Sequence, residues 1–255
     1  MNNNIHDFAL AILDANNITY FTGAGVSTDA GIPDFRSDKG LYNVLAKKYK
    51  GHPDRMLSHQ VYVQDPASFF QFQWKYMYHP DVEPAFPHKF PVKLQELGKN
   101  VPVITQNADG LHERAGSRRV YALHGSQYDF YCTKCGTPYS YEDLVLDEDQ
   151  VPRCPKDGHI VRSTAVLFGE SLDYQVLTGA IDAISQADLL IVAGTSLTVS
   201  PANQLVHYFS GKRLVVINNQ SLAQVSPNQM TFQEEITPVL EGVWEEICQE
   251  LGLED

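Results

Sequence analysis

The apolar run ITYFT at residues 18–22 leads directly into GAGVSTDAGIPDFR at residues 23–36. An open α/β sheet binds nucleotides where a strand ends in such a glycine-rich turn. Gly23 and Gly25 let the backbone turn tightly and bring its N–H groups close to a diphosphate. Gly-x-Gly alone is common at strand-to-helix turns, but the IPDFR that follows adds a rigid turn, a carboxylate, an aromatic face and a guanidinium. The stretch therefore predicts a nucleotide site at the end of the first strand.

A second set of polar side chains follows another apolar run, VPVIT at residues 101–105. It consists of Gln106, Asn107 and Asp109. If the two strands are parallel neighbours, their carboxyl ends share one edge of the sheet, and these side chains point into the same crevice as the glycine-rich turn. His124 follows, between an apolar residue and a glycine. A histidine has an ordinary pKa of about 6.5, so it can accept and release a proton at neutral pH.

Strands and helices alternate along the chain, which is typical of an α/β fold with a mostly parallel sheet. Besides the two runs above, we expect strands at 165–168, 189–193 and 213–217, and helices at 8–15, 174–185, 201–209 and 241–251. Two segments break this rhythm. Residues 38–85 are aromatic and look helical, while residues 127–161 are short-stranded and contain three of the four cysteines. Both leave from the same edge of the sheet, so we expect them to pack together as a smaller domain.

The composition favours a compact enzyme with neither a nucleic-acid partner nor a membrane partner. A chain of 255 residues is long enough for one large domain with a small insert. The net charge of −12 argues against a nucleic-acid surface, because binding phosphates needs clustered Lys and Arg. The best apolar stretch, residues 189–199, is too short and too polar to span a membrane, and the start MNNN does not resemble a signal peptide. We therefore expect a cytoplasmic protein, and we expect it to be a monomer.

Three cysteines have the spacing of a zinc ribbon. Cys132 and Cys135 form a C-x-x-C pair, and Cys154 follows at a typical distance along the chain. The fourth thiolate of a complete site is expected at position 157, where this chain has Asp157, with His159 two residues further on. Zinc accepts carboxylate oxygen and imidazole nitrogen, so we expect a mixed site with Asp157 as the fourth ligand. The alternatives are His159 in that role, or a site that has lost its metal.

Taken together, the motifs resemble those of the sirtuins, a family of NAD-dependent protein-lysine deacylases. The matching segments stand in the family's order and spread over nearly the whole chain. They are GAGVSTDAGIPDFRS (23–37), TQNADGLHERAG (105–116), LHGS (123–126), VLFGESL (166–172), GTSLTVSPA (194–202) and the strand end Ile217-Asn218.

The resemblance implies a Rossmann-like, NAD-binding domain in which helices cover both faces of a parallel sheet. This domain comprises residues 1–37, 86–126 and 162–255. The smaller domain combines a helical insert, residues 38–85, with a zinc-ribbon-like insert, residues 127–161. Zinc in this family is structural, so its loss would impair folding rather than chemistry.

The resemblance also implies what the crevice residues do. The acyl-lysine oxygen displaces nicotinamide from NAD, and His124 then deprotonates a ribose hydroxyl so that the acyl group moves onto ADP-ribose. Asn107 and Asp109 stabilise the oxocarbenium-like transition state, and Asp109 also holds the nicotinamide carboxamide. The implied NAD contacts, Asn107 and Asp109 included, are completed by Gly23, Ala24, Gly25, Asp34, Phe35, Arg36, Gln106, Gly194, Thr195, Ser196, Asn218 and Phe232.

The implied substrates are acyl-lysine peptides or proteins. Val166, Phe168, Gly169 and Glu170 belong to the segment that pairs with an extended peptide through main-chain hydrogen bonds, a mode with weak sequence selectivity. Sirtuins that prefer acidic acyl groups carry a Tyr and an Arg three residues apart in the helical insert. The aromatic stretch 69–77 has no Arg, which favours neutral acyl groups. These aromatics either line an apolar tunnel or form the core of the small domain itself.

Two other functions remain open at this point. One is an ADP-ribosyltransferase or NAD hydrolase that uses the same pocket without an acyl acceptor, and its products would distinguish it. The other is a non-catalytic NAD-binding module. The presence of Asn107, Asp109 and His124 argues against the second.

Overall fold

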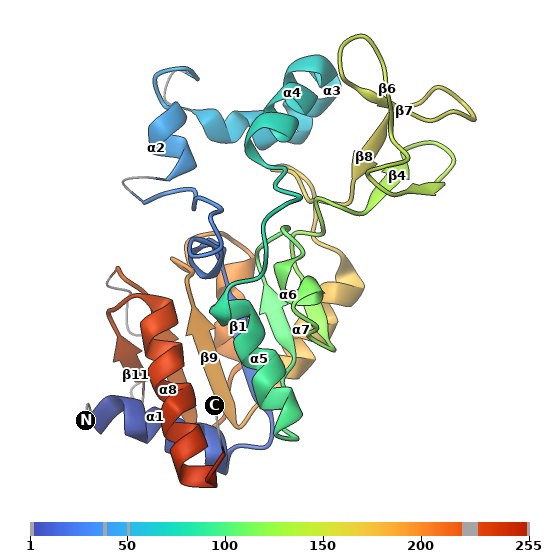
Figure 1. Cartoon of the computed structure of the whole chain (residues 1–255). Helices are drawn as coiled ribbons and strands as arrows, with labels where there is room; N and C mark the ends of the chain where they lie inside the picture. Colours follow the sequence, from blue (N-terminus) through green and yellow to red (C-terminus); the bar gives the residue numbers. More distant parts are fainter. Residues whose placement is uncertain (1–2, 38–39, 50–51, 221–228, 254–255) are drawn as a thin grey trace.

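The protein has two lobes in the computed structural model, which describes residues 3–37, 40–49, 52–220 and 229–253. The large lobe contains a six-stranded sheet and the helices that cover it. The small lobe lies above it in Figure 1 and is built from two separate segments, one helical and one made of short strands. The predicted α/β class, with a parallel sheet and two inserts that pack together, is confirmed.

Six parallel strands form the sheet in the order β11-β10-β9-β1-β2-β3. Their bounds are Ile18–Thr22 (β1), Val103–Thr105 (β2), Val120–Ala122 (β3), Leu189–Ala193 (β9), Arg213–Ile217 (β10) and Gln229–Phe232 (β11). The chain adds β2 and β3 on one side of β1 and places β9 to β11 on the other. This reversal is a topological switch point, where sheets of this kind bind ligands beyond the carboxyl ends of their strands.

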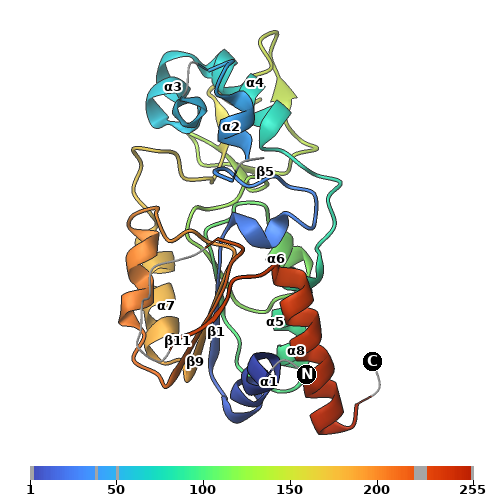
Figure 2. The same cartoon turned by 90° about the vertical axis from the view of Figure 1, so that its left-hand side faces the viewer.

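The apolar runs become strands because both faces of the sheet are buried. In β9, Leu189 and Ile191 pack into one core and Leu190 and Val192 into the other. Helices α1 (Asn3–Asp14), α5 (Phe86–Glu96) and α8 (Ile236–Leu251) cover the first face, and α7 (Tyr174–Ser185) and the 3₁₀ helix η3 (Ala202–Tyr208) cover the second (Figure 2). Two short helices, η1 (Ala24–Ser27) and α6 (Leu111–Arg114), follow β1 and β2 at the edge of the sheet.

The small lobe joins a helical half to a half of short antiparallel strands. The helices are α2 (Leu41–Leu45), η2 (Pro53–Leu57), α3 (His59–Gln64) and α4 (Pro66–Tyr76). The strands are β4 (Phe130–Cys132), β5 (Pro138–Tyr139) and β8 (Val161–Ser163) in one sheet, and β6 (Val145–Leu146) and β7 (Pro152–Arg153) in another. Phe69, Phe70 and Phe72 are buried in the core of this lobe, whereas Gln73 and Tyr76 of the same run line a crevice between the lobes.

The strand expected at residues 165–168 does not form. Its backbone groups are bound instead by two separate segments: Val166 N–H donates to the carbonyl of His124, and Phe168 N–H donates to that of Leu57 at the end of η2, both at 2.9 Å. The preceding residues form β8, which pairs with β4 of the small lobe. The apolar run next to Gly169 is an extended connection between the lobes, and the prediction of a strand there is wrong.

Other boundaries shift less. Residues 201–209 form a 3₁₀ helix, and the last helix starts at Ile236, five residues before the expected position 241. The proposed division into an NAD-binding domain and a small domain stays a prediction, and its last boundary falls within β8. Residues 38–39 and 50–51 of the helical insert lie outside the described residues. Within the described part of the chain, no helix combines the length and the apolar character that crossing a membrane requires.

Candidate active site and metal cluster

A crevice of about 360 Å³ lies between the lobes at the carboxyl ends of the central strands. It is lined by the residues that follow β1, β2, β9 and β10, together with α4 and the 165–170 connection. All the predicted NAD, catalytic and peptide residues line it, with one exception. Phe232 ends β11 with its side chain in the core, 2% exposed and 5.7 Å from the ring of Phe8. The structure thus removes Phe232 from the crevice, because the side chain at this strand position faces α1.

The glycines of the first loop are required by close packing. Gly25 N–H donates to the carbonyl of Gly194 at 2.8 Å, so the loops after β1 and β9 touch. A Cβ atom on Gly25 would lie 2.7 Å from the Cα of Gly194, and Gly194 itself has a φ of +63°. Only glycine fits at both positions. Both loops line the crevice at the end of the sheet.

Asn107 and Asp109 are held by a serine that the sequence analysis did not select. Ser27, 1% exposed, donates its hydroxyl proton to Oδ2 of Asp109 at 2.7 Å and accepts from Nδ2 of Asn107 at 3.0 Å. Asn107 also donates to the carbonyl of Gly23, and Asp109 Oδ1 accepts from the N–H of Leu111. Both crevice side chains therefore have a fixed orientation. The only sequence signal for Ser27 was its place within the glycine-rich stretch.

Behind this serine lies His88, on α5. Its Nδ1 accepts from the N–H of Ala85 at 3.2 Å, so its proton sits on Nε2, which donates to Ser27 Oγ at 3.1 Å. Burial lowers the pKa of His88. The result is a directed chain of hydrogen bonds from Ala85 through His88 and Ser27 to Asp109. No local sequence pattern points to His88, because residues 27 and 88 meet only in the folded protein.

A second buried histidine supports the same region. His112, 1% exposed, shares a hydrogen bond between its Nε2 and Thr22 Oγ1 at 3.1 Å. Burial lowers the pKa of His112 well below its ordinary value. A neutral, buried side chain with this partner has a structural rather than a catalytic role. It lies 4.9 Å from the ring of His88, edge to face.

His124 has the geometry of a general base. Its Nδ1 is 2.7 Å from the carbonyl oxygen of Gln106, and because a carbonyl only accepts, this nitrogen carries the proton. The unprotonated Nε2 is left for the crevice that the residue lines. Burial lowers the pKa of His124, although the hydrogen bond to Gln106 works in the other direction. The adjacent Gly125 has a φ of +67°, and a Cβ atom there would lie 2.1 Å from the carbonyl oxygen of Thr164.

Comparison with known proteins agrees with this geometry. A model of the Sir2 family matches residues 23–201, which covers the crevice loops after β1, β2 and β9 and the cysteine cluster. The chain belongs to the Sir2 family. This confirms the resemblance to sirtuins.

Relatives and solved structures match over nearly the full length. An NAD-dependent protein deacetylase of Clostridium perfringens is 44% identical over 94% of this chain and 98% of its own length. The structure of one Sir2 enzyme superimposes with a TM-score of 0.84 at 33% identity, over 98% of this chain and 100% of that one. A Sir2 enzyme with a p53 peptide and NAD+ gives a TM-score of 0.80 at 32% identity, over 96% and 98% of the two chains.

A second polar group lies at the far end of the Sir2 crevice. Gln106 Nε2 donates to Thr195 Oγ1 at 2.8 Å, and Asn218 Nδ2 donates to the Thr195 carbonyl at 2.8 Å. Thr195 thereby links the loops after β2, β9 and β10. Ser196 lies beside it, with its hydroxyl bonded to that of Thr198. This end of the crevice offers hydroxyl and amide groups and lies opposite the small lobe.

The 165–170 connection forms the rim of the crevice toward the small lobe. Phe168 is 46% exposed there. Burial raises the pKa of Glu170, but hydrogen bonds from Arg162, from the N–H of Leu167 and from His59 outweigh it and lower the pKa to about 2. The Glu170 carboxylate is therefore committed to holding this connection in place. The Glu170 carboxylate therefore acts on the crevice by fixing the backbone of the 165–170 connection.

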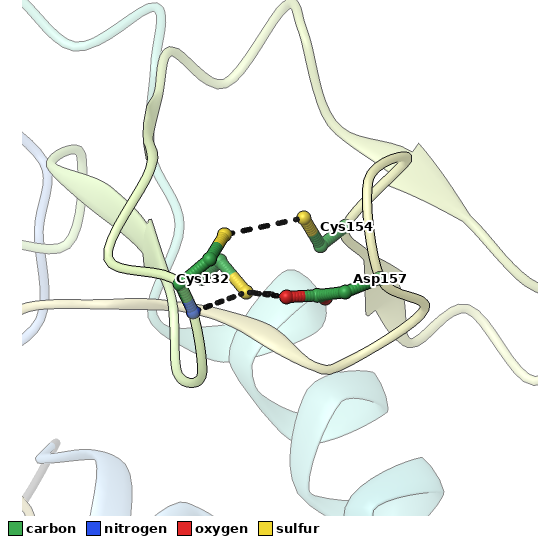
Figure 3. A group of neighbouring side chains, drawn as sticks. Cys132, Cys154 and Asp157 are labelled. Carbon is green, nitrogen blue, oxygen red and sulfur yellow. Dashed lines mark hydrogen bonds between the residues drawn. The ribbon is translucent and has the colours of Figure 1, made fainter.

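The three cysteines predicted to bind zinc converge with Asp157 on one side of the small lobe (Figure 3). One ligand atom from each of Cys132, Cys135, Cys154 and Asp157 lies within 4.8 Å of all the others. The Sγ atoms of Cys135 and Cys154 are 3.8 Å apart, about the separation that a tetrahedral zinc with bonds of about 2.3 Å requires. The carboxylate of Asp157 approaches Sγ of Cys132 to 3.5 Å. The donor set therefore fits zinc, with Asp157 rather than His159 in the cluster.

Proposed function

We propose that the crevice catalyses NAD-dependent protein-lysine deacylation, with the residues in the roles that follow. The observation that carries the proposal is the pairing of a half-buried His124, oriented through Nδ1, with a carboxylate and an amide fixed by one serine. A base that is oriented through Nδ1 and free at Nε2 is what a proton-transfer step requires. NAD supplies a ribose carbon that loses nicotinamide as a neutral molecule and takes on the acyl oxygen of the substrate.

In this assignment the large lobe binds NAD along its three loops. Gly23, Gly25 and Gly194 leave room for the diphosphate. Thr195 and Asn218 bind the adenosine end. Asn107 and Asp109 lie at the nicotinamide end, where their fixed oxygens stabilise developing positive charge on the ribose. His124 Nε2 then accepts a proton from a ribose hydroxyl, which frees that oxygen to take over the acyl group. Residues of the small lobe, among them Gln73 and Tyr76, form the opposite wall of the crevice.

The substrates are acyl-lysine peptides, which we propose to bind along the exposed edge of residues 165–169. Phe168 offers an exposed apolar side chain on this edge. Cys132, Cys135, Cys154 and Asp157 would hold a zinc ion that cross-links the short strands and takes no part in the chemistry. We further propose that the chain acts as a monomer in the cytoplasm without a nucleic-acid partner. The net charge of −12 supports the last point.

Product analysis by mass spectrometry tests the function. The protein is incubated with an acetyl-lysine peptide, or with the same peptide carrying unmodified lysine, each with and without NAD. Deacylation predicts one nicotinamide and one O-acetyl-ADP-ribose per acetyl group removed, with no turnover of the unmodified peptide. Free ADP-ribose from either peptide would indicate an NAD hydrolase, and an ADP-ribosylated peptide would indicate a transferase. NAD binding without any product would leave only the non-catalytic module.

A further inference from the structure

A buried arginine on β8, Arg162, fastens the 165–170 connection to the small lobe. Its side chain is 8% exposed, and its guanidinium lies 4.9 Å from the centre of the Tyr62 ring. It donates to both carboxylate oxygens of Glu170, at 2.6 Å and 3.1 Å, and to the carbonyl of Ala165 at 2.7 Å. Arg162 therefore binds the first residue of the connection through its backbone and the last through its carboxylate.

Glu170 extends this hold to the middle of the connection. Its Oε2 accepts from the N–H of Leu167 at 2.9 Å, and its own N–H donates back to the Leu167 carbonyl at 2.9 Å. Gly169 permits this turn, because its φ of +94° is one that residues with a side chain rarely adopt. The side chain of Leu167 is buried in the same small-lobe core as Tyr62. Position 167 is thus fixed through both its backbone and its side chain.

The helical half of the small lobe holds the connection as well. Both backbone groups of Phe168 are bound at 2.9 Å by the segment that ends η2 and begins α3, where His59 supplies the N–H. The imidazole of His59 also approaches Glu170, with 2.9 Å between Nδ1 and Oε1. From the large lobe, the carbonyl of His124 accepts from the N–H of Val166. These bonds give the connection one extended shape directly beside the base.

This shape is what a peptide needs if it pairs with the connection through main-chain hydrogen bonds, because the spacing of the backbone groups decides which bonds form. Side chains alternate along it as they do in a strand: Leu167 is buried, whereas Phe168 is exposed on the crevice side. A buried charge is costly to desolvate, and a methionine of similar length would pack against Tyr62 without that cost. Stability alone therefore does not explain an arginine at position 162.

We propose that Arg162 is a positioning residue for the acyl-lysine peptide, which acts by holding the 165–170 connection in the shape that the peptide pairs with. This deepens the proposed function and rests on it. Arg162 is not among the described residues that line the crevice, so its effect passes through Glu170 and the backbone. Its loss should weaken peptide binding and spare NAD. If two main-chain hydrogen bonds to the peptide are lost, the peptide affinity falls by about 5- to 150-fold.

The test uses Arg162→Lys, which keeps the positive charge but cannot bind Glu170 with two bonds and reach Ala165 as well. Calorimetry gives the Kd of an acetyl-lysine peptide and the Kd of NAD separately, and steady-state kinetics gives kcat and both KM values. We expect the Kd and KM of the peptide to rise by about 5- to 150-fold, while the Kd of NAD and kcat at saturating peptide change little. Glu170→Gln, which loses the acceptor for Leu167 N–H, should show the same pattern more weakly.

Arg153→Met is the matched control. This arginine also belongs to the small lobe and pairs with a carboxylate, that of Asp147 at 2.8 Å, but it lies outside the set of described residues that line the crevice. Its peptide Kd should equal that of the wild type. Hydrogen–deuterium exchange of the free proteins then measures the connection itself. The amide of Leu167 should be protected in the wild type and exchange faster in Arg162→Lys, whereas the amides of β1 should keep their protection.

Three results would overturn the proposal and leave the proposed function standing. One is a peptide Kd that neither Arg162→Lys nor Glu170→Gln changes. Another is exchange at Leu167 that is as slow in Arg162→Lys as in the wild type. The third is an equal rise of the peptide and NAD Kd values together with a lower Tm, which would make Arg162 structural. Wild-type protein that binds no acetyl-lysine peptide would instead refute the proposed function, and this inference with it.

Discussion

The large lobe holds its functional side chains at the ends of a sheet buried on both faces, whereas the small lobe holds its cysteines in or beside strands of two or three residues. In the large lobe, β1, β9 and β10 each have five residues and run parallel in register. In the small lobe, both residues of β6 are exposed, and Cys132 and Cys154 are themselves part of a core that has only two other buried members.

This difference indicates that chemistry and stability are separated between the lobes. The sheet supplies enough buried apolar surface to hold a crevice whose polar groups can be changed without unfolding. The zinc-ribbon insert buries too little apolar surface to be stable alone. A metal cross-link between its loops supplies the stability that a larger core would otherwise give. A change in the crevice should therefore alter turnover, and a change in the cysteine cluster should alter stability.

The largest effect should come from the base in the crevice. His124→Ala removes the proton acceptor, so we expect kcat on an acetyl-lysine peptide to fall by about 10²–10⁴-fold. NAD affinity and Tm should change little, because the base acts after NAD is bound. His207→Ala serves as control, since this histidine is exposed and outside the crevice. Equal losses of NAD binding and turnover in the His124 variant would make the residue structural.

The next effect should come from His88, which acts through Ser27 on Asp109 and Asn107. His88→Leu leaves Ser27 with Asn107 as its remaining donor and leaves the N–H of Ala85 unpaired, a loss of about 1–3 kcal/mol. If this loss destabilises the transition state relative to the bound substrates, kcat drops by about 5- to 150-fold. His88→Gln keeps a donor near Ser27 and should recover part of the activity. A Tm loss without any change in kcat would confine His88 to packing.

These two histidines also show which functional residues can be predicted from the sequence and which cannot. His124 was identifiable because it stands in a short motif beside a glycine, and crevice residues after β1, β2, β9 and β10 were identifiable because strand ends in a parallel sheet converge. The contact of His88 with Ser27 spans 61 residues and depends on how α5 packs on η1. Such a contact leaves no trace in local patterning.

Dependence on tertiary contacts also explains the two wrong predictions, the strand at 165–168 and the place of Phe232. The run at 189–193 is apolar throughout, and the sheet buries both of its faces. The run at 165–168 has a similar composition, but its neighbours are loops of both lobes rather than a strand. Phe232 was expected among the NAD contacts because the resemblance to sirtuins implied it, yet strand register turns its side chain toward Phe8. Composition predicts that a residue is buried, and register decides on which side.

A smaller effect should appear in the pH dependence of stability, and it should belong to the large lobe. Burial lowers the pKa values of His88, His112 and His124 in the folded protein. In the unfolded chain each titrates near 6.5, so the unfolded state binds more protons below that pH. Stability is thus complete above pH 6.5 and is lost as the pH falls toward the folded-state values, by at most about 1.4 kcal/mol per histidine and pH unit.

Urea unfolding at pH 7.5 and pH 5.5 measures this loss. His112→Gln removes one buried titrating group outside the crevice, so the difference between the two unfolding free energies should shrink by up to about 1.4 kcal/mol. The exposed His207, changed to Gln, should leave the difference as it is. An unchanged difference in the His112 variant would mean that other groups cause the acid sensitivity.

The smallest effect we predict comes from completing the thiolate set of the small lobe. The purified protein should contain about one zinc per chain, measured by elemental analysis. Asp157→Cys replaces a carboxylate by a fourth thiolate, so metal should bind more tightly and Tm should rise by about 2–4 °C, the shift that about 1 kcal/mol produces in a chain of this size. Asp157→Ala should have the opposite effect, while His159→Ala should retain zinc, because His159 lies outside the cluster. Turnover by the zinc-loaded Asp157→Cys protein should equal that of the wild type, since the cluster residues are not among those that line the crevice. A metal-free protein that stays folded and active would show that this insert is held together by its core alone, and the contrast between the lobes would then need another cause.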